Sequence, residues 1–173
     1  FYVTQSHGVS SPPKACTFCA TYDSAQVHRQ LRESGEHATF VTNPPAAPGS
    51  DPRVLKFDKD GNYITSYSLK HDDGTPATIH RVIVSPQGEV WVTDRAKKKI
   101  FVFDQNLKLK REIQENYLTC GLYVDAKGDL WMSTGGDGMV MKLDWNGKVL
   151  GWYGKHGRNT DSNDIGEGHY LAV

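Results

Sequence analysis

The chain has 173 residues, of which 38% are hydrophobic and 23% are charged, a composition typical of one globular unit. Its 20 basic and 20 acidic residues balance, so no net electric field would draw it onto nucleic acid or an anionic membrane. No apolar run approaches the ~20 residues that a membrane-spanning helix needs. The chain begins with Phe1 rather than Met, and we therefore expect an N-terminus that has been processed or cut.

Residues 1–38 lack the pattern of the rest of the chain, and we expect them to form an irregular leader that packs on the domain that follows. Within the leader, residues 25–33 suit either a short helix or a degenerate strand. Cys16 and Cys19 have the spacing of a zinc-ligand pair or a redox disulfide, but no second cysteine pair follows them. We prefer a local disulfide or two plain thiols, and the total of three cysteines leaves at least one without an internal partner.

Residues 39–69 form the first unit with a regular pattern, and we predict three strands in it. The predicted strands are 39–43, 53–58 and 63–67. The proline-rich stretch 44–52 between the first two is predicted to be a loop, because proline cannot donate to a strand ladder.

Residues 78–114 and 119–154 repeat one another at a spacing of 40 residues. Trp91 is matched by Trp131, and Asp104 by Asp144. The predicted strands are 78–84, 89–93, 100–103 and 107–113 in the first of these units, and 121–124, 129–133, 139–143 and 149–153 in the second.

Four short strands in a repeated unit of about 40 residues are the sequence signature of a β-propeller blade. The sequence therefore predicts an all-β propeller fold with blades at 39–69, 78–114 and 119–154, and the first strand of another blade at 169–173. Propellers typically close a ring of 4–8 blades, which leaves only short, protected sheet edges. We expect about six blades in the ring, with the others supplied by further sequence or by another chain. A small open stack of sheets is the alternative.

The blade sequence resembles that of the NHL-repeat propellers. The resemblance is carried by residues 79–95 and 99–104 and by the glycine-rich passages 152–157 and 166–173, and it covers about 39–173. It implies a six-bladed scaffold that serves many roles, so it specifies architecture more than activity. Within this family the chain is most similar to bacterial extracytoplasmic proteins and, more distantly, to peptidyl-hydroxyglycine amidating lyase.

The resemblance to the lyase implies zinc held by histidines that open the inner strands of alternate blades. His80, Cys120 and His169 occupy that position here, and imidazole nitrogen and thiolate are common zinc ligands. We therefore predict these three residues as candidate metal ligands. The alternative, which we prefer, is that histidine at this position donates a hydrogen bond to a carbonyl group of a neighbouring loop. The turn 134–138, where the lyase has a tyrosine, contains none.

Other conspicuous residues are predicted to be structural. Trp91 and Trp131 lie in the middle of strands, where we expect them to pack between neighbouring sheets. Asp94, Asp104 and Asp144 each follow a strand and are expected to cap turns. The basic residues 97–99, 108, 110 and 111 are expected to protect an outer strand from unwanted pairing. They are not interleaved with aromatic residues, so the stacking platform of a nucleic-acid site is missing.

These observations favour a non-catalytic binding or scaffold propeller that acts with other protein subunits in an extracytoplasmic assembly. No nucleic-acid partner is expected, and zinc is the one cofactor that we consider. The alternative is a zinc-dependent lyase or hydrolase that uses the ring of His80, Cys120 and His169. Gluconolactonase-like hydrolases rank last, because that class uses acidic and amide metal ligands.

Overall fold

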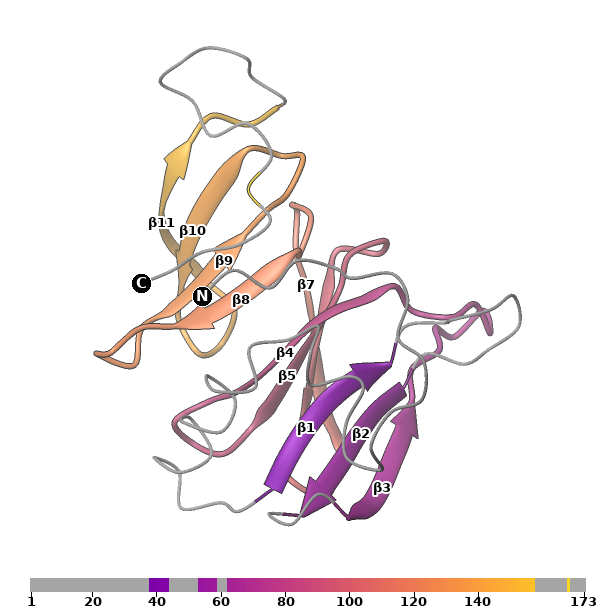
Figure 1. Ribbon diagram of the computed structural model, residues 1–173. Coiled ribbons are helices and arrows are strands. Elements are labelled where there is room, and N and C mark those ends of the chain that lie inside the picture. The colour runs from indigo at the N-terminus through magenta and orange to yellow at the C-terminus, as the bar shows by residue number, and fades with distance from the viewer. Residues whose placement is uncertain (1–37, 44–52, 59–61, 158–167, 169–173) are drawn as a thin grey trace, which may run out of the picture.

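The computed structural model describes residues 38–43, 53–58, 62–157 and 168 (Figure 1). Within these ranges the chain forms strands, turns and irregular segments, and no helix. The strands are β1 (Ala38–Asn43), β2 (Arg53–Asp58), β3 (Tyr63–Ser68), β4 (Ile79–Val84), β5 (Val90–Asp94), β6 (Lys99–Phe103), β7 (Leu109–Gln114), β8 (Gly121–Val124), β9 (Leu130–Ser133), β10 (Met139–Leu143) and β11 (Val149–Gly154).

The strands form three antiparallel sheets in which each strand pairs with its neighbour in sequence. The first sheet is β1-β2-β3, the middle sheet is β4-β5-β6-β7 and the last sheet is β8-β9-β10-β11 (Figure 1). The predicted all-β architecture with four-stranded sheets is confirmed. In the first sheet three strands are described. Residues 1–37 of the predicted leader (1–38) and the expected strand at 169–173 lie outside the described residues, and the last residue of the predicted leader, Ala38, is the first residue of β1.

The turns between the third and fourth strands begin with an aspartate that caps them, as predicted. Asp104 Oδ1 accepts hydrogen bonds from the main-chain N–H groups of Asn106 (2.8 Å) and Lys108 (2.9 Å). Asp144 accepts the equivalent pair in the last sheet. Both turns need a residue with positive φ, which is Gly147 (90°) in one and Leu107 (59°) in the other. Leu107 is nearly buried, so its packing offsets the strain of the left-handed backbone.

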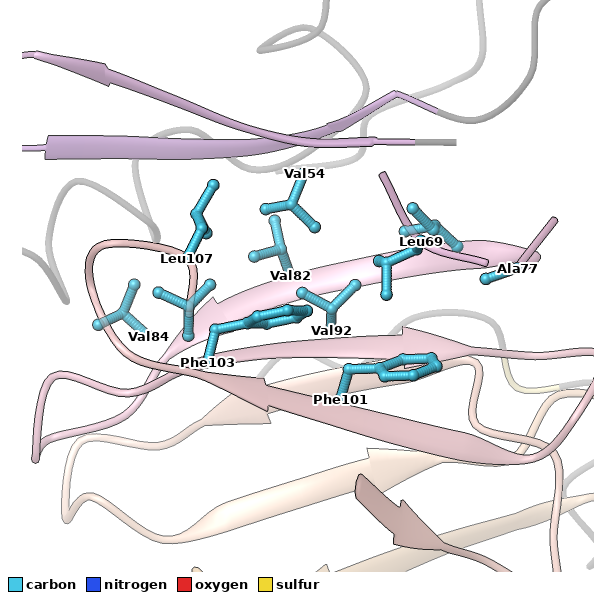
Figure 2. Close-up of a cluster of buried hydrophobic side chains, with 11 residues drawn as sticks. Val54, Leu69, Ala77, Val82, Val84, Val92, Phe101, Phe103 and Leu107 are labelled. Carbon is cyan, nitrogen blue, oxygen red and sulfur yellow. The ribbon is translucent and has the colours of Figure 1, made fainter. Parts of the chain in front are cut away.

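The first and middle sheets pack face to face around one apolar cluster. Figure 2 shows Val54 of β2 directed toward Val82 of β4, with Val92 and Phe103 beside them. The middle and last sheets enclose a second cluster, in which Trp91 and Ile83 meet Leu122 and Met132. All five residues of β5 are buried because both faces of the middle sheet are covered. The predicted position of Trp91 between two sheets is confirmed.

The first strands of the middle and last sheets, β4 and β8, contact each other. Among the described strands, the fourth strands β7 and β11 each pair with a single neighbour and form the outer edges of their sheets. Of the candidate metal residues, His80 therefore lies on an inner strand and Cys120 lies directly before one.

Candidate functional site

His80, on the inner strand β4, is half-buried and its ring Nδ1 lies 2.7 Å from the carbonyl oxygen of Cys120. A carbonyl oxygen only accepts hydrogen bonds, so Nδ1 carries the proton and donates it. In the neutral imidazole Nε2 then carries a lone pair, the form that binds a metal ion or accepts a proton. The predicted hydrogen bond from His80 to a carbonyl group of a neighbouring loop is therefore present, and it fixes the orientation of the imidazole ring.

Cys120 meets His80 through its main chain rather than through its thiol. Its N–H donates to the carbonyl of Ser133 (3.1 Å), and its side chain is fully buried. The thiol lies against Gly135 so closely that a Cβ added there would come within 2.4 Å of Sγ. Gly135 also has a positive φ of 55°, so a larger residue is disfavoured at this position for two reasons.

The third predicted ligand, His169, lies outside the described residues. Its neighbour Gly168 is described, and its carbonyl accepts a hydrogen bond from the N–H of Gly135 (3.2 Å). Among the described residues no group of three His, Cys, Asp or Glu side chains is placed to hold a metal ion. The zinc site thus stays a prediction, as do the pairings of Cys16 and Cys19 in the leader.

A buried histidine–aspartate pair lies beyond what the sequence predicted. His71 Nε2 and Asp94 Oδ2 are 3.0 Å apart, and the two side chains are 8% and 0% exposed. Asp94 Oδ1 accepts hydrogen bonds from the N–H groups of Thr78 (2.9 Å) and Ala96 (3.2 Å), which confirms its predicted role in capping a turn. Its contact with His71 is a second role that was not predicted. The pair ties the connection between the first and middle sheets to the end of β5. The only sequence signal was that the repeat replaces Asp94 by Thr134.

Glu115, just after β7, is a second buried group that the sequence did not reveal. Its residue is 7% exposed, and the buried Oε1 atom has no hydrogen-bond partner. Burial disfavours the charged carboxylate and raises the pKa of Glu115 to about 7. The repeat places an exposed residue, Lys155, at the equivalent position.

The basic face predicted on the middle sheet is largely paired with carboxylates. Arg111 donates two hydrogen bonds of 2.9 Å to Glu89, and Lys110 also contacts Glu89. These hydrogen bonds, those from Arg111 first, lower the pKa of Glu89 to about 2. Lys99 pairs with Glu112 at 2.7 Å. The exposed positions of the edge strand β7 are thus charged or polar.

The edge strand of the last sheet, β11, is uncharged and exposes apolar side chains, unlike β7. Residues 149–154, which form β11, contain no charged side chain. Leu150, Trp152 and Tyr153 are 57%, 64% and 68% exposed. In the first sheet the edge strand β3 likewise exposes Tyr63 and Ile64.

Comparison with known proteins bears on the fold. No protein-family model matches the chain, and a search of curated proteins gives no match. Among solved structures it is similar to virginiamycin B lyase from Staphylococcus aureus, with 23% identity, a TM-score of 0.52, and 67% of this chain and 37% of that one covered. Periplasmic gluconolactonase PpgL from Pseudomonas aeruginosa gives 20% identity and a TM-score of 0.52 over 69% of this chain and 39% of that one.

The WD40 repeats of RRP9 are similar at 13% identity, with a TM-score of 0.54, over 76% of this chain and 38% of that one. The chain therefore spans less than two fifths of the length of each of these proteins. At such identities the likeness bears on the fold alone, and the three proteins include enzymes as well as a WD40 repeat protein. Together with the three sheets, it shows that the described part of this chain has the fold of a β-propeller segment.

Proposed function

We propose that this chain belongs to a non-catalytic, NHL-type binding propeller that acts with other proteins in an extracytoplasmic assembly, and that a partner protein binds along the edge of β11. The observation that carries the proposal is the absence of charge on β11, together with the exposure of Leu150 and Trp152.

Edge strands present unpaired main-chain N–H and C=O groups, and charged side chains are the usual protection against pairing with another chain. The edge strand β7 has this protection in Lys110 and Glu112, whereas β11 does not. The edge strand β3 also lacks charged residues, but only two of its six residues are exposed, against four of the six in β11. An extended segment of a partner could add to β11 through main-chain hydrogen bonds while its apolar side chains cover Trp152. The partner is therefore expected to offer an uncharged, extended segment.

The test compares one substitution at two exposed edge positions. Trp152→Lys adds a charge to β11, and Ile64→Lys adds the same charge to β3 at a similar exposure. Tagged protein is purified from its native cells, and co-purified proteins are quantified by mass spectrometry. Amide hydrogen exchange in the isolated complex then reports which strand is protected.

We expect Trp152→Lys to abolish a partner that Ile64→Lys retains, and the amides of β11 to be protected in the complex. An unchanged set of partners in Trp152→Lys, or protection of β3 instead of β11, would refute the proposal. Cell fractionation tests the location separately, which we infer from the NHL resemblance and which agrees with the periplasmic location of PpgL.

A zinc-dependent lyase or hydrolase is the second candidate, and the orientation of His80 favours it. Donation from Nδ1 to a carbonyl is a common way of presenting Nε2 of a histidine to a metal. His80 and His169 would hold the ion, and zinc would supply an activated water molecule. Cys120, the third predicted ligand, offers its carbonyl to His80, while its thiol lies against Gly135. Elemental analysis of the parent and of a His80→Ala/His169→Ala variant separates the candidates. Near-stoichiometric zinc that the variant loses, with its thermal midpoint unchanged, supports the enzyme, whereas absence of zinc from the parent leaves the binding propeller.

A further inference from the structure

One face of the last sheet repeats, position by position, the face of the middle sheet that is covered by its neighbour. In the middle sheet the strand register aligns Ile83, Trp91, Val102 and Arg111 across β4 to β7. In the last sheet the register aligns the residues 40 positions later, which are Tyr123, Trp131, Lys142 and Gly151. A second row places Tyr153 where the middle sheet has Ile113. We call Trp131, Lys142 and Tyr153 the docking face.

The covered face of the middle sheet shows what such a face binds. Trp91 is fully buried, and the ring of Trp145, from the turn between β10 and β11, meets it edge-on at 5.3 Å. Arg111 lies over the ring of Trp91 and donates a hydrogen bond of 3.0 Å to the main-chain carbonyl of Trp145. The turn of the next sheet is therefore held by one aromatic contact and one cation–carbonyl hydrogen bond.

The interface between the first and middle sheets uses the same hydrogen bond. Lys56 of β2 donates through Nζ to the main-chain carbonyl of Gln105 at 2.7 Å. Gln105 and Trp145 are 40 residues apart, and each is the second residue of a turn that begins with aspartate. At both interfaces a cation of one sheet thus binds the same carbonyl in the turn of the sheet that follows.

The docking face has the same combination of a cation, a tryptophan and a carboxylate, and among the described residues no aspartate-initiated turn of a following sheet packs on it. Lys142 lies over the ring of Trp131 and pairs with Asp129 at 2.6 Å, as Arg111 lies over Trp91 and pairs with Glu89. The side chain of Lys142 is 34% exposed, Trp131 is half-buried and Tyr153 is 68% exposed. Closer to the inner strand the face is already buried, since Tyr123 is 3% exposed. In Figure 1 the last sheet stands at one end of the array of three sheets.

We propose that the docking face binds a further four-stranded sheet of the same repeat, and that Lys142 anchors this sheet by donating to the carbonyl of the second residue in its aspartate-initiated turn. Continuity with the two described interfaces supports this proposal, because both use this hydrogen bond and the third donor, Lys142, is in place. The aromatic pair of Trp131 and Tyr153, stacked at 6.5 Å, then becomes the apolar floor of the interface. This inference rests on the propeller architecture in the proposed function, but because it concerns the face of the sheet rather than the edge of β11, it can fail while partner binding at β11 holds, and the reverse.

Hydroxyl-radical footprinting of the complete protein purified from its source tests the proposal, since the chain contains its own standards. Trp91 is fully buried and marks slow oxidation, and Tyr63 of β3, which is 58% exposed and lies away from the edge of β11, marks fast oxidation in the same sample. We expect Trp131 to be oxidised at the slow rate of Trp91, with Tyr63 remaining fast. Oxidation of Trp131 at a rate near that of Tyr63 would overturn the proposal.

A benzophenone side chain introduced at position 142 identifies the occupant. The expected product joins position 142 to a peptide that contains an aspartate-initiated turn between two strands of this repeat, and the peptide sequence shows which chain contributes it. A cross-link to a segment without the repeat would overturn the proposal even if Trp131 is protected. The Trp152→Lys variant serves as the control and is expected to give the same cross-link.

Discussion

The middle and last sheets have the same plan, but they bury their repeated residues differently. Trp91 is fully buried between two sheets, whereas its counterpart Trp131 is half-buried. The repeat therefore determines where strands and turns form, while the neighbouring sheet determines what each side chain contributes to stability. The positions at which the two repeats differ also have consequences. Asp94 and Glu115 of the middle unit are buried carboxylic acids, whereas the counterpart of Asp94 is the uncharged Thr134 and that of Glu115 is the exposed Lys155.

The largest expected difference concerns the tryptophans. Trp91→Ala removes a buried side chain from between two sheets and should lower the free energy of unfolding by roughly 3–5 kcal/mol. Trp131→Ala should cost about half as much, because the ring is only half-buried and its loss exposes less apolar surface. Urea unfolding followed by circular dichroism measures both. Trp152→Ala, at an exposed site, is the control and should stay within about 0.5 kcal/mol of the parent.

The second difference concerns Asp94 and Thr134. Asp94→Ala leaves His71 and two main-chain N–H groups without their buried partner, and should cost about 3 kcal/mol. Thr134→Ala removes a hydroxyl that exchanges two hydrogen bonds with the main chain of Met139, and should cost about 1 kcal/mol. The measurement is the free energy of unfolding at neutral pH. A double-mutant cycle with His71→Ala isolates the contact between the two side chains, and a coupling energy near zero would contradict its assigned role.

The third difference is one of pH and concerns Glu115. Because burial raises the pKa of this carboxyl in the folded protein from 4.5 to about 7, the folded state binds a proton that the unfolded state has released. Its contribution to stability is complete below pH 4.5 and is lost as the pH rises through about 7. Glu115→Gln should therefore gain about 2 kcal/mol relative to the parent between pH 4 and pH 8.

Denaturant unfolding at several pH values between these limits measures how the difference in free energy of unfolding between Glu115→Gln and the parent changes with pH. Lys155→Gln alters the exposed counterpart of Glu115 and should show no such gain between the two pH values. A constant offset between Glu115→Gln and the parent across this range would mean that the carboxyl titrates normally in the folded protein.

The sequence predicted the strands closely because alternation and turn residues are local properties. The predicted strand 139–143 coincides with β10, and β4 begins one residue later than expected. The contact between His80 and the loop before β8 also follows from the repeat, which places Cys120 beside it in the next sheet. The pair of His71 and Asp94 could not be predicted, since His71 lies in a connection that has no counterpart in the other units.

The burial of Glu115 could not be predicted either, because it depends on how two sheets and a turn come together. In both cases the signal available in the sequence was a departure from the repeat, with threonine opposite Asp94 and lysine opposite Glu115. Positions at which an acidic residue of one unit is not matched by an acidic residue in the other are thus where the sequence of this chain should be searched for buried carboxylates.

The smallest expected difference compares Arg111 with Lys142, the two residues that lie over the repeated tryptophans. Arg111→Ala removes a paired contact to Glu89 and the hydrogen bond to the carbonyl of Trp145, and should cost about 1.5 kcal/mol at neutral pH. Lys142→Ala removes a pair with Asp129 in which both side chains are about one third exposed, and should cost about 0.5 kcal/mol. The free energies of unfolding at pH 7 and at low pH measure both.

The pH dependence separates the pair with Glu89 from the other contacts of Arg111. Because its partners lower the folded-state pKa of Glu89 from 4.5 to about 2, the stabilisation is present above pH 4.5 and is lost as the pH falls toward 2. The cost of Arg111→Ala should therefore shrink at low pH to the part that is due to Trp91 and Trp145. A cost for Lys142→Ala that rises to the level of Arg111→Ala in the complete protein would mean that Lys142 has found its own carbonyl partner.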